Sequence, residues 1–97
     1  MALKIEWDVR KAEANLKKHD VRFEEAQTVF GDPFARIAED YTHSDDESRW
    51  HIIGTSTQNR ILVVAYTERN ESIRIITARK AEPAERKRYE KIRDNDQ

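Results

Sequence analysis

Two arginines in the second half of the chain, Arg74 and Arg79, lie in a run of residues that is typical of a β-strand. A guanidinium group stays charged, and its planar fork donates two parallel hydrogen bonds, so it suits phosphate oxygens. In a regular strand, side chains five positions apart point to opposite faces. We therefore expect a phosphate site with one arginine on an open sheet face and the other near its rim.

The three histidines are candidates for proton transfer, but they are scattered along the chain. His19 follows two lysines and is expected to cap a helix or to carry a proton at the site. His43 falls in the acidic segment 39–47, which predicts a hydrated loop, and His51 is expected to be a satisfied side chain on a strand. No HxxxH spacing and no His–Cys pair is present, so we expect no metal site.

Length and composition exclude several classes of protein. The 97 residues allow one domain, 1–97, and they include no cysteine, which excludes thiolate chemistry and a disulfide framework. The two glycines cannot build a phosphate-binding P-loop, and we expect no cofactor. No apolar run approaches the roughly 18 residues of a membrane span, and the first residues lack a signal-peptide pattern. We expect a soluble, cytoplasmic protein without membrane association.

The formal net charge of −1 conceals an uneven distribution. Residues 69–93 hold nine basic and four acidic side chains, whereas residues 1–68 carry a net charge of −4. A basic segment on an acidic body is able to bind a polyanion or an acidic protein. The alternative is a solvated helix face with ion pairs at i,i+4 spacing, such as Glu82 with Arg86.

The hydropathy pattern predicts an α+β domain with the element order β-α-α-β-β-β-β-α. It consists of a small antiparallel sheet, two N-terminal helices packed on one face, and a C-terminal helix, so the other sheet face is open to a ligand. The last helix has few large apolar residues and is expected to fray or to dock on another surface. The expected strands span 3–7, 34–38, 49–57, 60–68 and 72–79, and the expected helices span 9–18 after the cap Asp8, 23–30 and 83–93.

An ordered set of segments extends over residues 5 to about 90. They are Glu6-Trp7-Asp8, Lys11-Ala12, Asn15-Leu16, Lys18-His19, Phe23-Glu24-Glu25-Ala26, Val29-Phe30, Asp32-Pro33, Ile53-Gly54, Val63-Val64, residues 66–69 (Tyr-Thr-Glu-Arg), residues 73–81 (Ile-Arg-Ile-Ile-Thr-Ala-Arg-Lys-Ala), Glu85 and Tyr89. In their order and spacing, these segments resemble the BrnT toxin family.

This resemblance implies a RelE-like fold and a ribonuclease toxin of a type II toxin-antitoxin system that inhibits translation and growth. It also implies a ribbon-helix-helix antitoxin similar to BrnA, through which operator DNA is bound. Two positions depart from the family pattern. Asp20 stands where glycine is common, and Arg22 stands where serine would form a capping box with Glu25. Both changes affect the local stability of the second helix.

The resemblance and the two strand arginines together lead to the hypothesis of metal-independent RNA cleavage by the ribose 2′-hydroxyl. This reaction needs proton carriers and positive charge at the phosphate. We assign the phosphate to Arg74 and Arg79, and the proton transfers to Lys18, His19 or Glu68. RNA binding is assigned to Arg60, Arg69, Tyr66 and Lys80.

Two of these assignments compete with structural interpretations, and the activity itself has two rivals. Glu68 is equally expected to pair with Arg69 or Arg74, and core packing is favoured over base stacking for Trp7 and Tyr66. In the first rival, the chain is a non-catalytic module that binds the antitoxin or nucleic acid and acts as a co-repressor. In the second, it is an inactive copy that keeps only antitoxin binding and operator repression.

Overall fold

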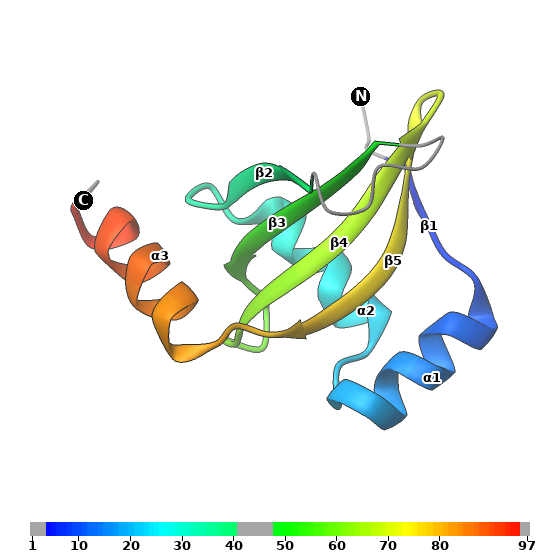
Figure 1. Ribbon diagram of the computed structural model, residues 1–97, viewed down its shortest axis with the longest axis horizontal. Coiled ribbons are helices and arrows are strands. Elements are labelled where there is room, and N and C mark those ends of the chain that lie inside the picture. The colour runs from blue at the N-terminus through cyan, green and yellow to red at the C-terminus, as the bar shows by residue number, and fades with distance from the viewer. Residues whose placement is uncertain (1–3, 41–47, 96–97) are drawn as a thin grey trace.

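The computed structural model describes residues 4–40 and 48–95, so the prediction for His43 lies outside the described residues. In this part of the chain five strands form one sheet, in the order β1-β5-β4-β3-β2 (Figure 1). The elements are β1 (Lys4–Glu6), α1 (Val9–His19), α2 (Phe23–Ala26), the 3-10 helix η1 (Gln27–Gly31), β2 (Arg36–Asp40), β3 (Arg49–Thr55), β4 (Ile61–Arg69), β5 (Ser72–Lys80) and α3 (Pro83–Asn95).

The predicted fold class and element order are confirmed, with two differences in detail. The sheet is mixed, because β1 pairs with β5 in parallel while the other neighbours are antiparallel. The predicted second helix, 23–30, divides into α2 and the tighter turn η1, where Thr28 Oγ1 donates a 2.6 Å hydrogen bond to the carbonyl of Glu25.

The hydrophobic core lies between the sheet and the helices α2 and η1 (Figure 1). Phe23 and Val29 from this layer are fully buried. The rings of Phe30 and Tyr66 pack in a T-shaped arrangement with their centroids 5.1 Å apart, and the rings of Trp7 and Phe23 do so at 5.9 Å. Core packing is therefore confirmed for both Tyr66 and Trp7.

Polar contacts at the ends of α1 fix the helix beside β5. The carboxylate of Asp8 accepts hydrogen bonds from the backbone of Arg10 (2.7 Å) and Lys11 (3.3 Å), which confirms the predicted cap. The buried Asn15 donates to the carbonyls of Val21 (3.0 Å) and Ala78 (2.8 Å), and accepts from Ala78 N–H (3.0 Å). Asn15 thus satisfies backbone groups at the edge of β5.

The two departures from the family pattern have the expected structural effects. Asp20 ends α1 in the left-handed conformation, with φ of 59° and ψ of 35°. Arg22 precedes α2 and makes no side-chain cap hydrogen bond. The Glu25 side chain, which would complete a capping box, is instead buried and pairs with Arg60 and Ser56.

Replacing Asp20 with glycine is expected to raise the free energy of unfolding by up to about 1 kcal/mol, because glycine adopts this conformation without a Cβ clash. The ion pair with Lys80 that the change removes is long, at 3.9 Å, and both side chains are exposed, so its loss costs little. Urea titration of Asp20→Gly measures the gain. A midpoint below that of the wild type would contradict the assignment of backbone strain to Asp20.

The C-terminal helix α3 docks on the rest of the domain mainly through Tyr89, which is 2% exposed. The Tyr89 hydroxyl lies 2.9 Å from Thr55 Oγ1 and donates a short hydrogen bond to Asp32. Asp32 also accepts from the backbone of Thr55 (2.8 Å) and Phe34 (2.9 Å). A Cβ on Gly54 would lie 3.0 Å from the same carboxylate, so this close approach favours glycine. None of the described helices is long and apolar enough to cross a membrane.

Candidate active site on the open face of the sheet

The face of the sheet opposite α2, here called the open face, carries the side chains that alternate with the core residues of β3 and β4. Cross-strand partners point to the same side of a sheet, so the register defines which residues share this face. Three rows run across it: Arg36, Ile53, Val63 and Arg79; then Ala38, His51, Ala65 and Thr77; then Arg49, Thr67, Arg74 and Glu6.

The prediction that Arg74 and Arg79 point to opposite faces is wrong. Val63 pairs with Arg79, Ala65 with Thr77, and Thr67 with Arg74, so the register shifts by one residue between Ala65 and Tyr66. This β-bulge inserts Ile76 into β5 and reverses the alternation that a regular strand would have. Both arginines therefore lie on the open face.

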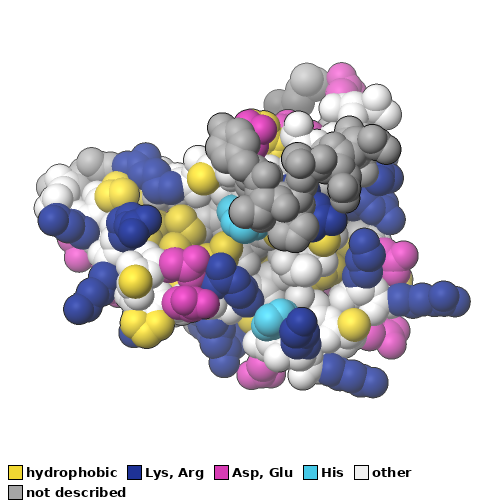
Figure 2. All heavy atoms as spheres, viewed as in Figure 1, with side chains coloured by type: hydrophobic (Ala, Val, Ile, Leu, Met, Phe, Trp, Pro, Cys, Tyr) yellow, Lys and Arg dark blue, Asp and Glu magenta, His cyan; other side chains and the backbone are white. Residues whose placement is uncertain are grey.

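Arg79 is held by a carboxylate from the start of α3. Its Nη1 and Nη2 donate to Glu85 Oε1 and Oε2 at 2.8 and 3.0 Å, which is the two-point geometry of a strong ion pair. Glu85 Oε1 also accepts from the backbone of Glu82 at 2.8 Å, so the same carboxylate caps α3. Figure 2, viewed onto the open face, shows basic and acidic side chains side by side between α3 and the sheet.

The pKa of Glu85 is lowered to about 2, first by the hydrogen bonds from Arg79, against the opposing effect of burial. The charges of Arg79 and, to a smaller extent, His51 also lower this pKa, so His51 lies near the pair. About a third of each partner stays exposed, with 34% for Arg79 and 36% for Glu85. Arg79 has five N–H donors, and Nη1 also gives a long hydrogen bond of 3.4 Å to the Lys80 carbonyl. The donors that neither Glu85 nor Lys80 uses are available to an anion.

Arg74 is held in a similar way at the other end of the open face. Its Nη1 donates to Glu6 Oε2 at 2.8 Å, across the parallel pairing of β1 with β5. The Arg74 side chain is 30% exposed. Glu6 is thus the ion-pair partner of Arg74, a role that one interpretation of the sequence gave to Glu68.

A cavity of about 310 Å³ lies between α3 and the open face. Its polar lining includes His51, Glu85, Arg36 and Arg88, and its apolar lining includes Ile53, Val63 and Ile92. This size is at the lower end of the range for small-ligand pockets, about 300–1,000 Å³.

His51, Arg36 and Arg49 share this face with the predicted arginines, and the sequence pattern did not single them out as site residues. The available signal was the alternation in β3, where Arg49, His51 and Ile53 occupy every second position between the partly or fully buried Trp50 and Ile52. Placing them beside Arg79 required the register with β4 and β5, which strand alternation alone does not provide.

Two of the predicted proton carriers lie outside the open face. Lys18 and His19 are at the end of α1 and line a separate shallow cavity of about 250 Å³ along the edge of β5, which also includes Thr77. Thr77 is the last residue of the open-face row that contains His51, and Lys18 and His19 lie past this end of the row.

The remaining predicted site residues are spread over other parts of the domain. Glu68 is exposed and lines the cavity on the helix side of the sheet that contains Phe30 and Tyr66. Arg69 is exposed near the β4–β5 turn, and Tyr66 is 4% exposed in the core. Arg60 donates to Glu25 at 2.9 Å, and Lys80 lies 3.9 Å from Asp20. Arg60 and Lys80 line a common groove beside α3.

Over residues 4–40 and 48–95, no group of three or more His, Cys, Asp or Glu side chains is arranged to hold a metal ion. The ion pairs described on the open face are those of Arg74 with Glu6 and Arg79 with Glu85. This arrangement favours an anionic ligand.

Comparison with known families gives a match over residues 7–85 to the family described as "Ribonuclease toxin, BrnT, of type II toxin-antitoxin system". The match covers most of the chain and includes Arg74 and Arg79. The chain belongs to the BrnT family of ribonuclease toxins. It is therefore a toxin of a type II toxin-antitoxin system, which implies an RNA substrate and an antitoxin partner.

The BrnT fold is also found in a solved structure, the "1.1 Angstrom-resolution crystal structure of the Brucella abortus ribonuclease toxin, BrnT". The TM-score is 0.64 at 21% sequence identity, over 84% of this chain and 99% of that chain. Comparison with curated proteins gives no match. The family match ends at Glu85, so most of α3 lies beyond it.

The stability of this BrnT-family toxin is expected to fall as the pH drops below about 4.5. Hydrogen bonds from Arg60 lower the pKa of Glu25. Burial opposes the shift at Asp32, but hydrogen bonds from Tyr89 and Thr55 lower its pKa, and Glu85 has a pKa of about 2. Depressed folded-state pKa values contribute stability above the unfolded-state values and lose it as the pH falls through the folded-state values. Urea midpoints at pH 7, 5 and 3 test this, and equal midpoints at pH 5 and 3 would contradict it.

Proposed function

We propose that this toxin cleaves single-stranded RNA on the open face of its sheet, without a metal ion, through attack by a ribose 2′-hydroxyl. The observation that supports the proposal is the presence of Arg74, Arg79 and His51 on one face of the sheet, around Ala65 and Thr77. In this reaction the 2′-oxygen forms a bond to the adjacent phosphorus, and the bond from phosphorus to the 5′-oxygen breaks. One proton leaves the 2′-hydroxyl and another reaches the departing 5′-oxygen.

Arg79 is proposed to stabilise the negative charge that builds up on the scissile phosphate, and Arg74, at the other end of the open face, is proposed to bind the neighbouring phosphate of the strand. Both guanidinium groups are positioned in advance by carboxylates, at 2.8–3.0 Å for Arg79 and 2.8 Å for Arg74. Donors held in place before the reaction need no reorganisation when charge develops, and this is the main source of electrostatic catalysis. The cavity beside His51 is proposed to receive the base next to the scissile phosphate.

His51 is proposed as one proton carrier, because it lies on the open face in the row between those of Arg79 and Arg74. Lys18 and His19 lie beyond the other end of this row, past Thr77, and are proposed as carriers for the second transfer. Glu68 lies on the helix side of the sheet, and its role as a carrier stays a prediction that this mechanism does not use.

Replacing His51 with glutamine is expected to lower the cleavage rate constant by about 10²–10⁴-fold, because glutamine keeps hydrogen-bonding capacity but does not transfer a proton at neutral pH. Rates under saturating RNA separate this loss from weaker binding. His19→Gln, measured in parallel, tests the second carrier. A His51→Gln protein that cleaves at the wild-type rate would remove His51 from the mechanism.

The experiment that tests the proposed activity compares three substrates of one sequence in excess EDTA. The folded wild type is expected to cleave single-stranded RNA and to leave intact both the matching DNA and an RNA with one 2′-deoxy sugar at the cleavage site. Intact RNA in EDTA, with cleavage restored by a divalent metal, would overturn the metal-free mechanism. Intact RNA under both conditions would favour the non-catalytic alternative.

Family membership further supports a proposal about the cellular role. We propose that the toxin acts in the cytoplasm, inhibits translation and growth, and is neutralised by a ribbon-helix-helix antitoxin that also binds operator DNA. Induced expression is expected to arrest growth, and co-expression of the neighbouring open reading frame is expected to relieve the arrest. The antitoxin is also expected to raise the thermal midpoint of the toxin. Growth without arrest would contradict this role.

A further inference from the structure

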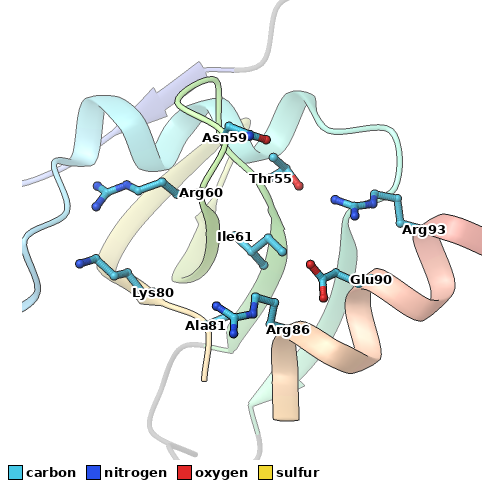
Figure 3. A pocket seen from close by; sticks show the side chains of 9 residues that line it. All are labelled: Thr55, Asn59, Arg60, Ile61, Lys80, Ala81, Arg86, Glu90 and Arg93. Carbon is cyan, nitrogen blue, oxygen red and sulfur yellow. The ribbon is translucent and has the colours of Figure 1, made fainter. Parts of the chain in front are cut away.

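A basic groove of about 690 Å³ lies between α3 and the ends of β4 and β5. Figure 3 shows Arg86, Glu90 and Arg93 extending from α3 on one side, with Arg60 and Lys80 on the other side. Asn59 lies above them at the β3–β4 turn. We call this cavity the α3 groove.

The cations of the α3 groove differ in how firmly they are engaged. Arg60 forms an ion pair with the buried carboxylate of Glu25. Lys80 is 55% exposed and reaches Asp20 only at 3.9 Å. Arg93 contacts the neighbouring Asp94 at 3.2 Å and lies over the Tyr89 ring, 5.5 Å from its centroid. The contacts that Lys80 and Arg93 make with these carboxylates are therefore weak, and an anion in the groove can replace them.

Arg86 is the fourth cation of the groove. Its backbone N–H donates a 2.8 Å hydrogen bond to the Glu82 carbonyl at the start of α3. The expected ion pair between the side chains of Glu82 and Arg86 is not formed in the part of the chain that the structure describes. The Arg86 side chain is exposed and lines the groove, so its positive charge is available there.

The α3 groove is connected to the open face through consecutive residues. Arg79 and Lys80 are neighbours in β5, so their side chains point to opposite faces: Arg79 to the open face and Lys80 to the helix side, where it lines the groove. On α3 the adjacent residues Glu85 and Arg86 divide in the same way, because Glu85 lines the cavity beside His51 and Arg86 lines the groove. Positive charge therefore continues around the start of α3.

We propose that the α3 groove binds phosphates of the RNA strand outside the scissile bond. This inference rests on the proposed function, and it extends the substrate to a strand that passes from Arg79 around the start of α3 to Lys80, Arg86 and Arg93. A polynucleotide needs regularly available cations along its backbone. An acidic peptide would also need apolar anchors, and the apolar lining is limited to Ile61 and Ala81, so RNA fits better. Arg86 and Arg93 lie in the part of α3 that follows the family match, so the match does not include this side of the groove.

The test uses the full chain and a twelve-nucleotide 2′-O-methyl RNA, which cannot be cleaved by its 2′-oxygen. Fluorescence anisotropy measures its binding by the wild type, by Lys80→Glu/Arg86→Glu, and by the control Lys87→Glu, whose exposed side chain on α3 lines neither cavity. The double variant is expected to bind at least tenfold more weakly. Its slope of log K against log salt should shrink by about 0.7 for each phosphate that the groove no longer neutralises. Lys87→Glu should bind within twofold of the wild type.

Three outcomes would overturn the inference: equal binding by the double variant and the wild type, equal weakening by Lys87→Glu, or tight binding of polyglutamate in the groove without binding of the RNA. Circular dichroism of each variant confirms that it is folded. Cleavage of an unmodified RNA by the wild type is measured separately. Failure of the proposed activity and failure of the groove to bind RNA are therefore distinguished, because the binding comparison does not depend on turnover.

Discussion

Replacing Arg79 with alanine is expected to lower the rate constant for RNA cleavage by about 10²–10³-fold, the loss typical of removing one preorganised donor to a developing negative charge. The protein should stay folded, because both Arg79 and Glu85 are about one-third exposed and water can solvate the carboxylate that remains. Single-turnover cleavage of an RNA oligonucleotide measures the effect.

Two further variants separate the contribution of charge from that of geometry at Arg79. Arg79→Lys keeps a positive charge but loses the planar fork, so it should recover only part of the rate. Lys87→Ala removes a cation from the exposed surface of α3 and should cleave like the wild type. Full activity in a folded Arg79→Ala protein would show that the phosphate does not bind beside Arg79.

Replacing Arg60 with alanine is expected to destabilise the fold by about 3 kcal/mol, which is the largest stability effect that we predict. The side chain of Glu25 is only 2% exposed, and Arg60 gives it two hydrogen bonds that connect α2 to the start of β4. Removing one partner of such a pair leaves a buried charge and costs about 3–5 kcal/mol. The lower value applies because the Arg60 side chain is 30% exposed.

Urea unfolding of Arg60→Ala and of Arg60→Ala/Glu25→Gln tests this interpretation. The second change removes the buried charge, so the double variant should be more stable than Arg60→Ala alone. If Arg60→Ala unfolds at the wild-type midpoint, Arg60 has no structural role, and its charge belongs with the RNA-binding residues of the α3 groove.

The order of the elements could be predicted from the sequence because each has a local signal. Asp8 marks the start of α1, Asn70 marks a turn with φ of 55°, and the apolar run of β4 indicates a central strand. The bulge at Ile76 has no such signal, because it depends on how β5 pairs with β4. Because of this one inserted residue, Arg74 and Arg79 lie on a shared face and not on opposite faces, as a regular strand would place them.

The sequence identified site residues only where the type of side chain was enough to indicate a role. Arg74 and Arg79 were selected because a strand arginine suits phosphate, and both lie on the open face. His51 was not selected, because its neighbours in space come from β4 and α3 rather than from its own strand. Arg60 and Tyr66 have the side chains expected of RNA-binding residues, but the buried carboxylate of Glu25 and the ring of Phe30 give them structural roles.

The central claim, metal-free attack by the 2′-hydroxyl on the open face, is tested most directly by the chemical ends of the RNA fragments. Mass spectrometry of products formed in excess EDTA identifies these ends. The account predicts one fragment that ends in a 2′,3′-cyclic phosphate, or in its hydrolysed monophosphate, and one fragment that begins with a 5′-hydroxyl. Fragments with a 3′-hydroxyl and a 5′-phosphate would contradict it, because water would then be the nucleophile.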